Sequence, residues 1–171
     1  MMTRPDRSES GGPTLGLRPV GPDDHETLVG IYASTRADEL ALVPWSSAEK
    51  DAFVRQQFDL QDHHYRLHFP ASHFDVILAD GAPVGRLSVH HGQEVVTILD
   101  IALLPAARGR GIGTRLLTEV LAEADHRSLP ARLHVDLDGR ARPLYERLGF
   151  RVVGDDGVRA SMERPCAISQ A

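Results

Sequence analysis

The chain has 171 residues, a length that predicts a single domain with its own hydrophobic core. Its net charge of −5 argues against a nucleic-acid-binding module, because such modules are usually basic. The only cysteine, Cys166, cannot form an intrachain disulfide, which favours a reducing, cytoplasmic setting.

The two ends of the chain are expected to lie outside the domain. Residues 1–13 are polar and rich in Gly, Pro and Ser, which predicts a flexible tail rather than a secretory signal. No run of about 18 apolar residues occurs, so no membrane span is expected. We therefore place the domain at residues 14–164 and a mobile C-terminal tail, which includes Cys166, at residues 165–171.

The first half of the predicted domain begins with a strand and two helices and ends with a hairpin. Ser46 and Glu49 are three residues apart, the spacing of a helix capping box, and Asp80-Gly81 is a hairpin turn signal. In chain order, we expect a strand over residues 14–20, a helix over 21–40, a helix over 47–68, and two strands joined by a turn over 73–91.

The second half of the predicted domain alternates strands and helices and then closes with a hairpin. Its first strand is apolar on both faces, which predicts burial on both faces. In chain order, we expect a strand over residues 94–105, a helix around 116–124, a strand over 131–137, a short helix over 142–149, and strands over 150–154 and 158–164. Strands joined by helices imply parallel pairing, so the predicted class is mixed α/β (α+β).

The segment RGRGIG, residues 108–113, lies between the apolar strand and the amphipathic helix that follows it. The N-terminus of a helix has unpaired N–H groups and a partial positive charge, and glycine lets a ligand approach the backbone closely. Arginine adds charge-assisted hydrogen bonds to phosphate. The segment therefore predicts a diphosphate site at the start of this helix.

The spacing of these glycines excludes two common phosphate-binding motifs. A Rossmann fingerprint needs G-x-G-x-x-G, whereas the glycines here follow G-x-G-x-G. A P-loop needs a Lys before its Ser or Thr, whereas Thr114 follows Gly113 directly. The alternative without a ligand is a tight connection that uses glycine for close packing.

Two motifs resemble those of the GNAT N-acetyltransferase superfamily. R-x-x-G-x-G after a strand that ends in proline resembles its acetyl-coenzyme A motif, with Arg108, Gly111 and Gly113 at the defining positions. The segment DGRARPLYERLGF, residues 138–150, resembles its late motif, although Asp138 stands where Asn is common. The resemblance covers about residues 14–164. It implies a mixed sheet of six to seven strands, helices on both faces, and two parallel central strands that splay apart.

The resemblance also implies a cofactor, acetyl-coenzyme A, and the residues that hold it. Backbone groups of the strand before the loop would bind the pantetheine arm and the thioester, and the glycine segment would bind the pyrophosphate. The implied cofactor-binding residues are Ile101, Ala102, Leu103, Arg108, Gly109, Arg110, Gly111, Ile112, Gly113, Thr114, Asp138 and Tyr145.

Acetyl transfer needs a proton donor for the departing thiolate and a way to remove a proton from the amine. Tyr145 occupies the superfamily's tyrosine position and is the candidate donor; the alternative is a core aromatic on a helix face that also carries Ala141 and Leu148. Asp100 lies in the apolar strand and is the candidate base, or else an anchor for an arginine or the backbone. Many members carry Glu earlier on this strand, where this chain has Thr97.

Nine histidines are further candidates for proton transfer or metal binding. His90 and His91 end a predicted strand near the expected substrate, where one of them could assist proton removal. His64 and His68 would share a helix face, but no third ligand follows at a familiar spacing, so we expect no metal site.

We therefore expect an N-acetyltransferase that moves an acetyl group from acetyl-coenzyme A to a primary amine by direct attack in a ternary complex. The alternative is a non-catalytic acyl-coenzyme A sensor on the same fold. The expected partner is a small-molecule or peptide amine, without nucleic acid or membrane, and a homodimer is compatible with the resemblance. Cys166 has no base beside it in sequence, which argues against an acyl-enzyme.

Overall fold

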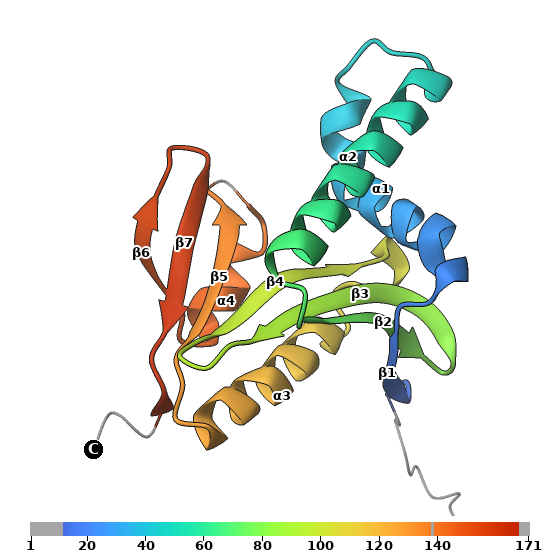
Figure 1. The fold of residues 1–171 in the computed structure, drawn as a ribbon. Coiled ribbons are helices and arrows are strands. Elements are labelled where there is room, and N and C mark those ends of the chain that lie inside the picture. The colour runs from blue at the N-terminus through green and yellow to red at the C-terminus, as the bar shows by residue number, and fades with distance from the viewer. Residues whose placement is uncertain (1–11, 138, 168–171) are drawn as a thin grey trace, which may run out of the picture.

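The computed structural model describes residues 12–137 and 139–167. In these residues, seven strands form one sheet in the order β1-β2-β3-β4-β5-β7-β6 (Figure 1). The strands are β1 (Leu15–Pro19), β2 (His73–Ala79), β3 (Ala82–His91), β4 (Val96–Leu103), β5 (Ala131–Asp136), β6 (Arg151–Asp155) and β7 (Arg159–Arg164). β4 and β5 pair in parallel and the other neighbours are antiparallel, which confirms the predicted mixed α/β class.

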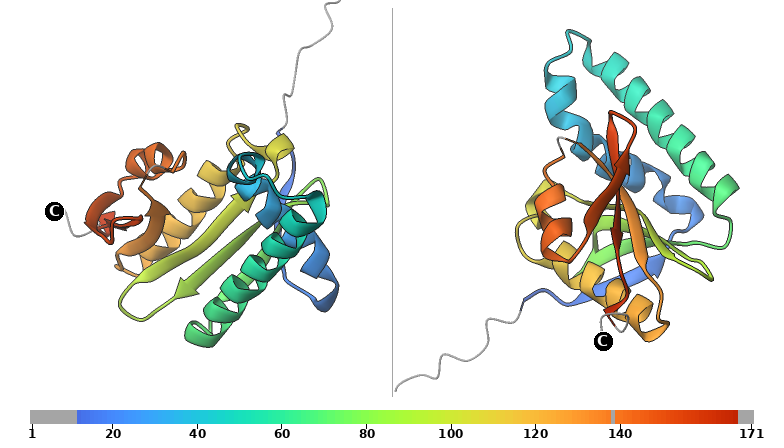
Figure 2. Two further views of the ribbon diagram at one scale, coloured as in Figure 1. Left: turned by 90° about the horizontal axis from the view of Figure 1, so that it is seen from above. Right: turned by 90° about the vertical axis from the view of Figure 1, so that its left-hand side faces the viewer.

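Within the described part of the chain, four α-helices cover the two faces of this sheet (Figure 2). They are α1 (His25–Ala41), α2 (Ser47–His68), α3 (Ile112–His126) and α4 (Arg142–Arg147), with 3-10 turns η1 (Pro22–Asp24) and η2 (Pro105–Ala107). The second helix spans the predicted residues, and Ser46 and Glu49 form the predicted capping box at its start. In the described part of the chain, no helix has both the length and the apolar character needed to cross a membrane.

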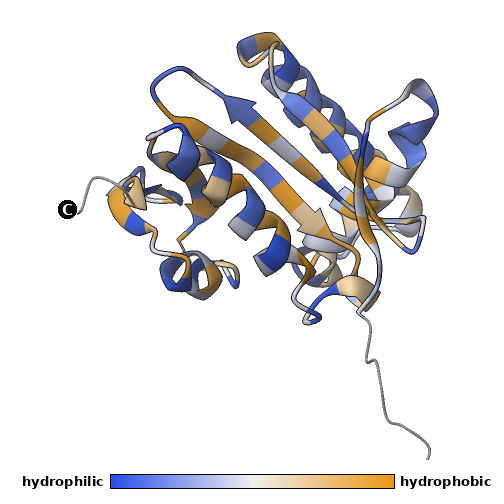
Figure 3. Ribbon diagram, turned by 90° about the horizontal axis from the view of Figure 1, so that it is seen from below, coloured by the Kyte–Doolittle hydropathy of each residue, from blue (hydrophilic) through white to orange (hydrophobic). Residues whose placement is uncertain are grey.

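The core consists of three clusters that follow the two faces. α1 and α2 bury one cluster against β2 and β4, and α3 buries a second against β2, β3 and β4. The third cluster lies between α3, α4 and the strands β4, β5 and β7. Figure 3 shows the result, with apolar stretches along the strands and helices that are apolar on one side and polar on the other. The packing gives the molecule an α1–α2 face and an α3–α4 face.

The two parallel strands separate soon after they meet. Pairing between β4 and β5 covers three residue pairs, from Val96↔Ala131 to Ile98↔Leu133, although β4 continues to Leu103. The register with β3 also shifts here, because Ser88 pairs with Asp100 and Val89 with Ile98, which leaves a bulge at Leu99. Figure 1 shows β4 and β5 diverging beyond this point, as the resemblance implies.

Candidate active site

The glycine segment places the start of α3 beside the end of β4. Gly109 and Gly111 have φ angles of 69° and 78°, in the left-handed region that glycine adopts without strain. Gly111 is the N-cap of α3, and a side chain at this position would meet no atom within 4 Å. Ile112 is buried and fixes the first turn, which also contains Gly113 and Thr114. The first N–H groups of a helix have no acceptor within it, and the empty space at Gly111 leaves room for an anion at this end of α3.

The side chain of Arg108 holds this loop in place. Its Nε donates to the carbonyl of Leu103 at 2.8 Å, and its Nη2 donates to the carbonyl and Oγ of Ser34 at 3.2 and 3.1 Å. The guanidinium thus joins the end of β4 to α1. Arg110 is exposed in the same loop. Of the two arginines, Arg110 is the one whose side chain is left to meet a phosphate.

Beyond the bulge, one side of β4 has no strand partner among the described residues. The bulged carbonyl of Leu99 accepts a hydrogen bond from the Tyr65 hydroxyl of α2 at 3.0 Å. The side chain of Ala102 packs under α1, and Ile101 and Leu103 pack under α3. Because these side chains are used in packing, the strand can offer a ligand only its backbone groups, which is what the sequence predicts for residues 101–103.

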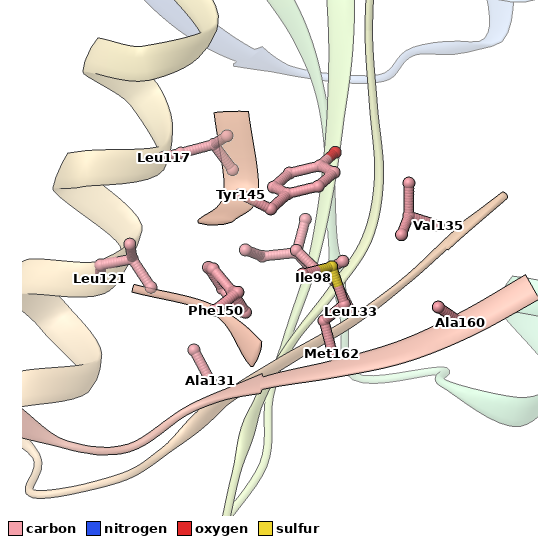
Figure 4. Close-up of a cluster of buried hydrophobic side chains, with 10 residues drawn as sticks. All are labelled: Ile98, Leu117, Leu121, Ala131, Leu133, Val135, Tyr145, Phe150, Ala160 and Met162. Atoms are coloured by element: carbon pink, nitrogen blue, oxygen red, sulfur yellow. The ribbon is translucent and has the colours of Figure 1, made fainter. Parts of the chain in front are cut away.

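Tyr145 lies on α4 and is 8% exposed. Its ring meets that of Phe150 edge-on at 6.0 Å, and in Figure 4 its hydroxyl points away from Phe150 and Ala131. Burial, helped by the negative charge of Asp100, raises the pKa of Tyr145 to about 12. The phenol therefore stays protonated at neutral pH, so it can donate a proton but is a poor base.

Asp100 is part of a buried ion pair. Its Oδ2 lies 2.5 Å from the Nε of Arg86, which is 8% exposed on β3. Arg86 also donates from Nη2 to Gln61 at 2.8 Å and lies over the rings of Tyr32 and Phe58. This pairing matches the anchor interpretation of Asp100, because the carboxylate compensates a guanidinium that is held away from water. The structure provides no separate support for a catalytic role of Asp100.

A small cavity lies beside this ion pair, between α2 and the α1–α2 face of the sheet. Its volume is about 20 Å³, enough for one water-sized molecule. Residues from α1, α2, β2, β3 and β4 line it, including Phe58, Tyr65, Arg86, Ser88 and Asp100. The cavity therefore touches both the ion pair and the tyrosine that holds the bulge.

The predicted histidine candidates lie in different places. His91 faces α3, where its Nδ1 lies 3.0 Å from Glu123. His90 contacts Ser72 at 3.1 Å and pairs in the sheet with Thr97. The rings of His64 and His68 lie 4.2 Å apart, and within residues 12–137 and 139–167 no group of three His, Cys, Asp or Glu side chains is arranged for a metal ion. Of the two candidates on β3, His90 is the one on the α1–α2 face.

Two further predictions concern Asp138 and Cys166, in the C-terminal part of the chain. Asp138 lies outside the described residues, so its predicted contact with the cofactor stays a prediction. Cys166 is 5% exposed rather than part of a mobile tail, because Arg164 pairs with Asp125 of α3 and Ala167 donates to the same carboxylate at 2.9 Å. These contacts hold residues 164–167 against the end of α3.

Sequence reasoning missed two residues that shape the site. Arg86 is a charged residue in the buried middle of β3, and Asp100 is a charged residue in the neighbouring strand β4. Two opposite charges in adjacent buried strands could have predicted their pairing. Tyr65 carries no comparable signal, because its target is a backbone carbonyl exposed by the bulge.

Comparison with known proteins places this arrangement in a family. Residues 35–150 match the sequence model of the Acetyltransferase (GNAT) family. The PaiA N-acetyltransferase of Thermoplasma acidophilum, solved in complex with coenzyme A, is 19% identical and has a TM-score of 0.69, covering 89% of this chain and 99% of its own. An acetyltransferase of Thermus thermophilus is 23% identical with a TM-score of 0.64, covering 89% and 97%.

A curated relative matches over a shorter stretch. The mycothiol acetyltransferase of Streptomyces avermitilis is 34% identical over 98 residues, which is 55% of this chain. The match spans 32% of that relative's length, about a third. The family match covers more than half of the chain and includes both the glycine segment and the helix of Tyr145. The chain belongs to the GNAT acetyltransferase family.

Proposed function

We propose that this acetyltransferase moves an acetyl group from acetyl-coenzyme A to a primary amine by direct attack while both are bound. One observation carries the proposal: the open N-terminus of α3 lies next to the β4 edge that β5 leaves unpaired. The diphosphate of coenzyme A needs an anion site, which the N-terminus of α3 supplies. Its amide-containing arm needs free backbone donors and acceptors, which the unpaired edge of β4 supplies.

The residues of the loop fit the diphosphate of coenzyme A. Gly111 has a left-handed backbone at the start of α3, and a side chain there would project into space that the described residues leave empty. Arg110 adds a positive charge at the exposed side of the loop. The pantetheine arm would then follow the free edge of β4 over residues 99–103. Coenzyme A in the complex of the Thermoplasma relative supports the same ligand.

Tyr145 supplies the proton that the reaction needs when the thiol leaves. The amine nitrogen forms a bond to the acetyl carbonyl carbon, and the bond from that carbon to sulfur breaks. The thiolate then takes a proton from the phenol of Tyr145. The phenol still carries this proton at neutral pH, because burial raises its pKa to about 12. The second N–H proton of the attacking amine restores the phenol.

Direct attack is favoured over an acyl-enzyme because Cys166 is in the wrong place. Its Sγ lies 3.9 Å from the carbonyl of Asp125, near the last turn of α3, whereas the loop lies at the first turn. A helix rises about 1.5 Å per residue, so the 15 residues of α3 separate the two by roughly 20 Å. Cys166 is also only 5% exposed, so its thiol, buried against the end of α3 that lies far from the loop, is a poor candidate for an acyl-enzyme nucleophile.

Isothermal titration with acetyl-coenzyme A, with ATP and NAD as competitors, tests the proposal. We expect selective binding of acetyl-coenzyme A, and Gly111→Glu should weaken it at least tenfold because a carboxylate would face the diphosphate. Gly81→Glu is the matched control, since Gly81 also has a left-handed backbone (φ 80°) and open space but lies in the β2–β3 turn. Equal binding by the wild type and Gly111→Glu would contradict the loop assignment.

A second assay tests the chemistry once binding is established. Thiol release from acetyl-coenzyme A is followed in the presence of spermidine, free amino acids, an aminoglycoside and a short peptide with a free N-terminus. Release that depends on one of these amines supports acetyl transfer to that class. Binding without release for any amine would instead favour an acyl-coenzyme A sensor.

A further inference from the structure

The α1–α2 side of β5 and β7 is a polar surface next to the point where β4 and β5 part. Leu133 and Val135 point into the core on the opposite side, as Figure 4 shows. Because side chains alternate along a strand, the residues between them project to the α1–α2 side. On β5 and β7 these are Arg132, His134, Asp136, Arg159, Ser161 and Glu163. We call this surface the outer face of β5 and β7.

His134 occupies a special position on this outer face. The last β4–β5 pair is Ile98↔Leu133, so His134 is the first residue of β5 beyond the pairing. Its counterpart along β4 is Leu99, the bulged residue whose carbonyl accepts from Tyr65. His134 therefore lies at the mouth of the gap, on the side from which α2 approaches.

The surroundings of His134 disfavour the charged form of its imidazole. Partial burial lowers the pKa of His134 from its usual value, and the positive charges of Arg159 and Arg132 lower it further against the opposing effect of Asp156. Burial and then the charge of Asp100 raise the pKa of Tyr65, and Arg159 opposes this rise, so its guanidinium lies within electrostatic reach of both sides of the mouth. Asp136 and Glu163, which pair with Arg159 and Arg132, complete the charged groups on this face.

The other candidate bases are occupied. The carboxylate of Asp100 lies against Arg86, and His91 faces Glu123 on the α3 side of the sheet. His90 contacts the hydroxyl of Ser72, and its ring lies 5.2 Å from that of Phe69. His134 has neither an ion-pair partner nor a hydrogen-bonded side chain recorded among the described residues, which leaves its lone pair accessible.

We propose that His134 is the general base that deprotonates the acceptor amine at the mouth of the β4–β5 gap. This inference rests on the proposed function and deepens it. The acceptor arrives as an ammonium ion, and one of its N–H protons moves to the imidazole, which becomes an imidazolium. The resulting lone pair attacks the acetyl carbon, the C–S bond breaks, and the sulfur gains its proton through Tyr145. The imidazolium then releases its proton to water.

NMR of the histidine rings tests the position of His134 without any acceptor. His134→Gln identifies its resonance, and His63→Gln, an exposed residue of α2, identifies a reference resonance. We expect saturation with acetyl-coenzyme A to move the His134 signal and leave that of His63 in place. If calorimetry shows that acetyl-coenzyme A binds but the His134 signal does not move, His134 is not at the acetyl site and this inference is wrong.

Kinetics test the base role itself with the best acceptor among spermidine, amino acids, an aminoglycoside and a short peptide. We expect His134→Gln to lower kcat/KM for the amine about 100-fold near pH 7, with the Kd for acetyl-coenzyme A unchanged. The variant depends on free amine from solution, so its kcat/KM should rise tenfold per pH unit and approach that of the wild type above pH 9. His63→Gln should keep the wild-type profile.

The outcomes separate this inference from the proposed function. Failure of the wild type to bind acetyl-coenzyme A would overturn both. An active wild type with an unchanged pH profile in His134→Gln would overturn the base role alone. If the wild type acetylates none of the amines, the NMR result decides whether His134 lies at the acetyl site that the proposal requires.

Discussion

At the scale of single residues, burial changes what each polar group can do. Tyr145 illustrates this, because the same packing that makes it part of the core raises the pKa of its phenol to about 12. A fully exposed tyrosine would be equally protonated at neutral pH but would not be held in one position. The two interpretations of the sequence, core aromatic and proton donor, therefore describe one residue in two roles.

Replacing Tyr145 by Phe tests the donor role. Phenylalanine keeps the ring that packs on Phe150 and removes only the hydroxyl, so we expect kcat to fall about 100-fold while the Kd for acetyl-coenzyme A stays constant. Phe150→Leu is the control for packing: it should lower Tm and leave kcat within a few-fold. Steady-state kinetics and thermal unfolding supply both readouts. Unaltered turnover in Tyr145→Phe would reduce this residue to a core aromatic.

Replacing Asp100 by Asn separates an anchor from a base. Arg86 is 8% exposed, and removing its carboxylate leaves a buried charge without its counterion. We expect the free energy of unfolding to drop by about 3 kcal/mol, measured by denaturant titration. The double variant Arg86→Met/Asp100→Leu should recover much of this loss, because it removes both charges. A 100-fold loss of turnover with unchanged stability would instead assign Asp100 as the base.

At the scale of secondary-structure elements, local signals predicted most of the boundaries. The capping box fixed the start of α2, and Asp80-Gly81 fixed the β2–β3 turn, where both residues have positive φ angles. Gly149 similarly ends the α4 segment with a φ of 94°. Each of these signals acts between residues that are close in sequence, so the sequence alone contains it.

Features that depend on distant residues were harder to predict. The bulge at Leu99 arises from the register of β3 against β4, and the apolar run of β4 does not reveal it. Residues 165–167, expected in the tail, lie against the domain because Arg164 reaches Asp125, 39 positions away, and Ala167 donates to the same carboxylate. His134 belongs to an alternating pattern that also describes an ordinary solvated sheet face, and only the end of the β4–β5 pairing distinguishes it.

At the scale of the whole molecule, ion pairs join the separate layers. Arg18 and Asp24 connect β1 to the start of α1, Arg55 and Glu26 connect α2 to α1, and Arg164 and Asp125 connect β7 to α3. Hydrogen bonds from arginine lower the pKa of Asp24 and of Glu26 to about 2, and they lower the pKa of Asp125 as well. The unfolded chain therefore binds protons more tightly than the native protein at these three carboxyls.

The sign of the pH dependence follows from these shifts. A carboxyl with a lowered pKa stabilises the native state above its unfolded value near 4, and this contribution is lost as the pH falls toward the native value. Burial raises the pKa of Asp75, which opposes the trend, but three lowered carboxyls outweigh it. We expect Tm to change little above about pH 5 and to fall steadily between pH 5 and pH 2, as measured by calorimetry.

Asp125→Asn tests whether the layer-joining pairs cause this loss. Asparagine does not titrate, so the variant should be less stable than the wild type at pH 7, and this difference should shrink as the pH falls through the lowered pKa of Asp125. Asp51→Asn, an exposed carboxylate of α2, should follow the wild type throughout. The Tm difference between Asp125→Asn and the wild type could instead stay constant from pH 7 to pH 2. In that case the packing of residues 164–167 on α3, and not the charge of Asp125, holds β7 to the rest of the domain.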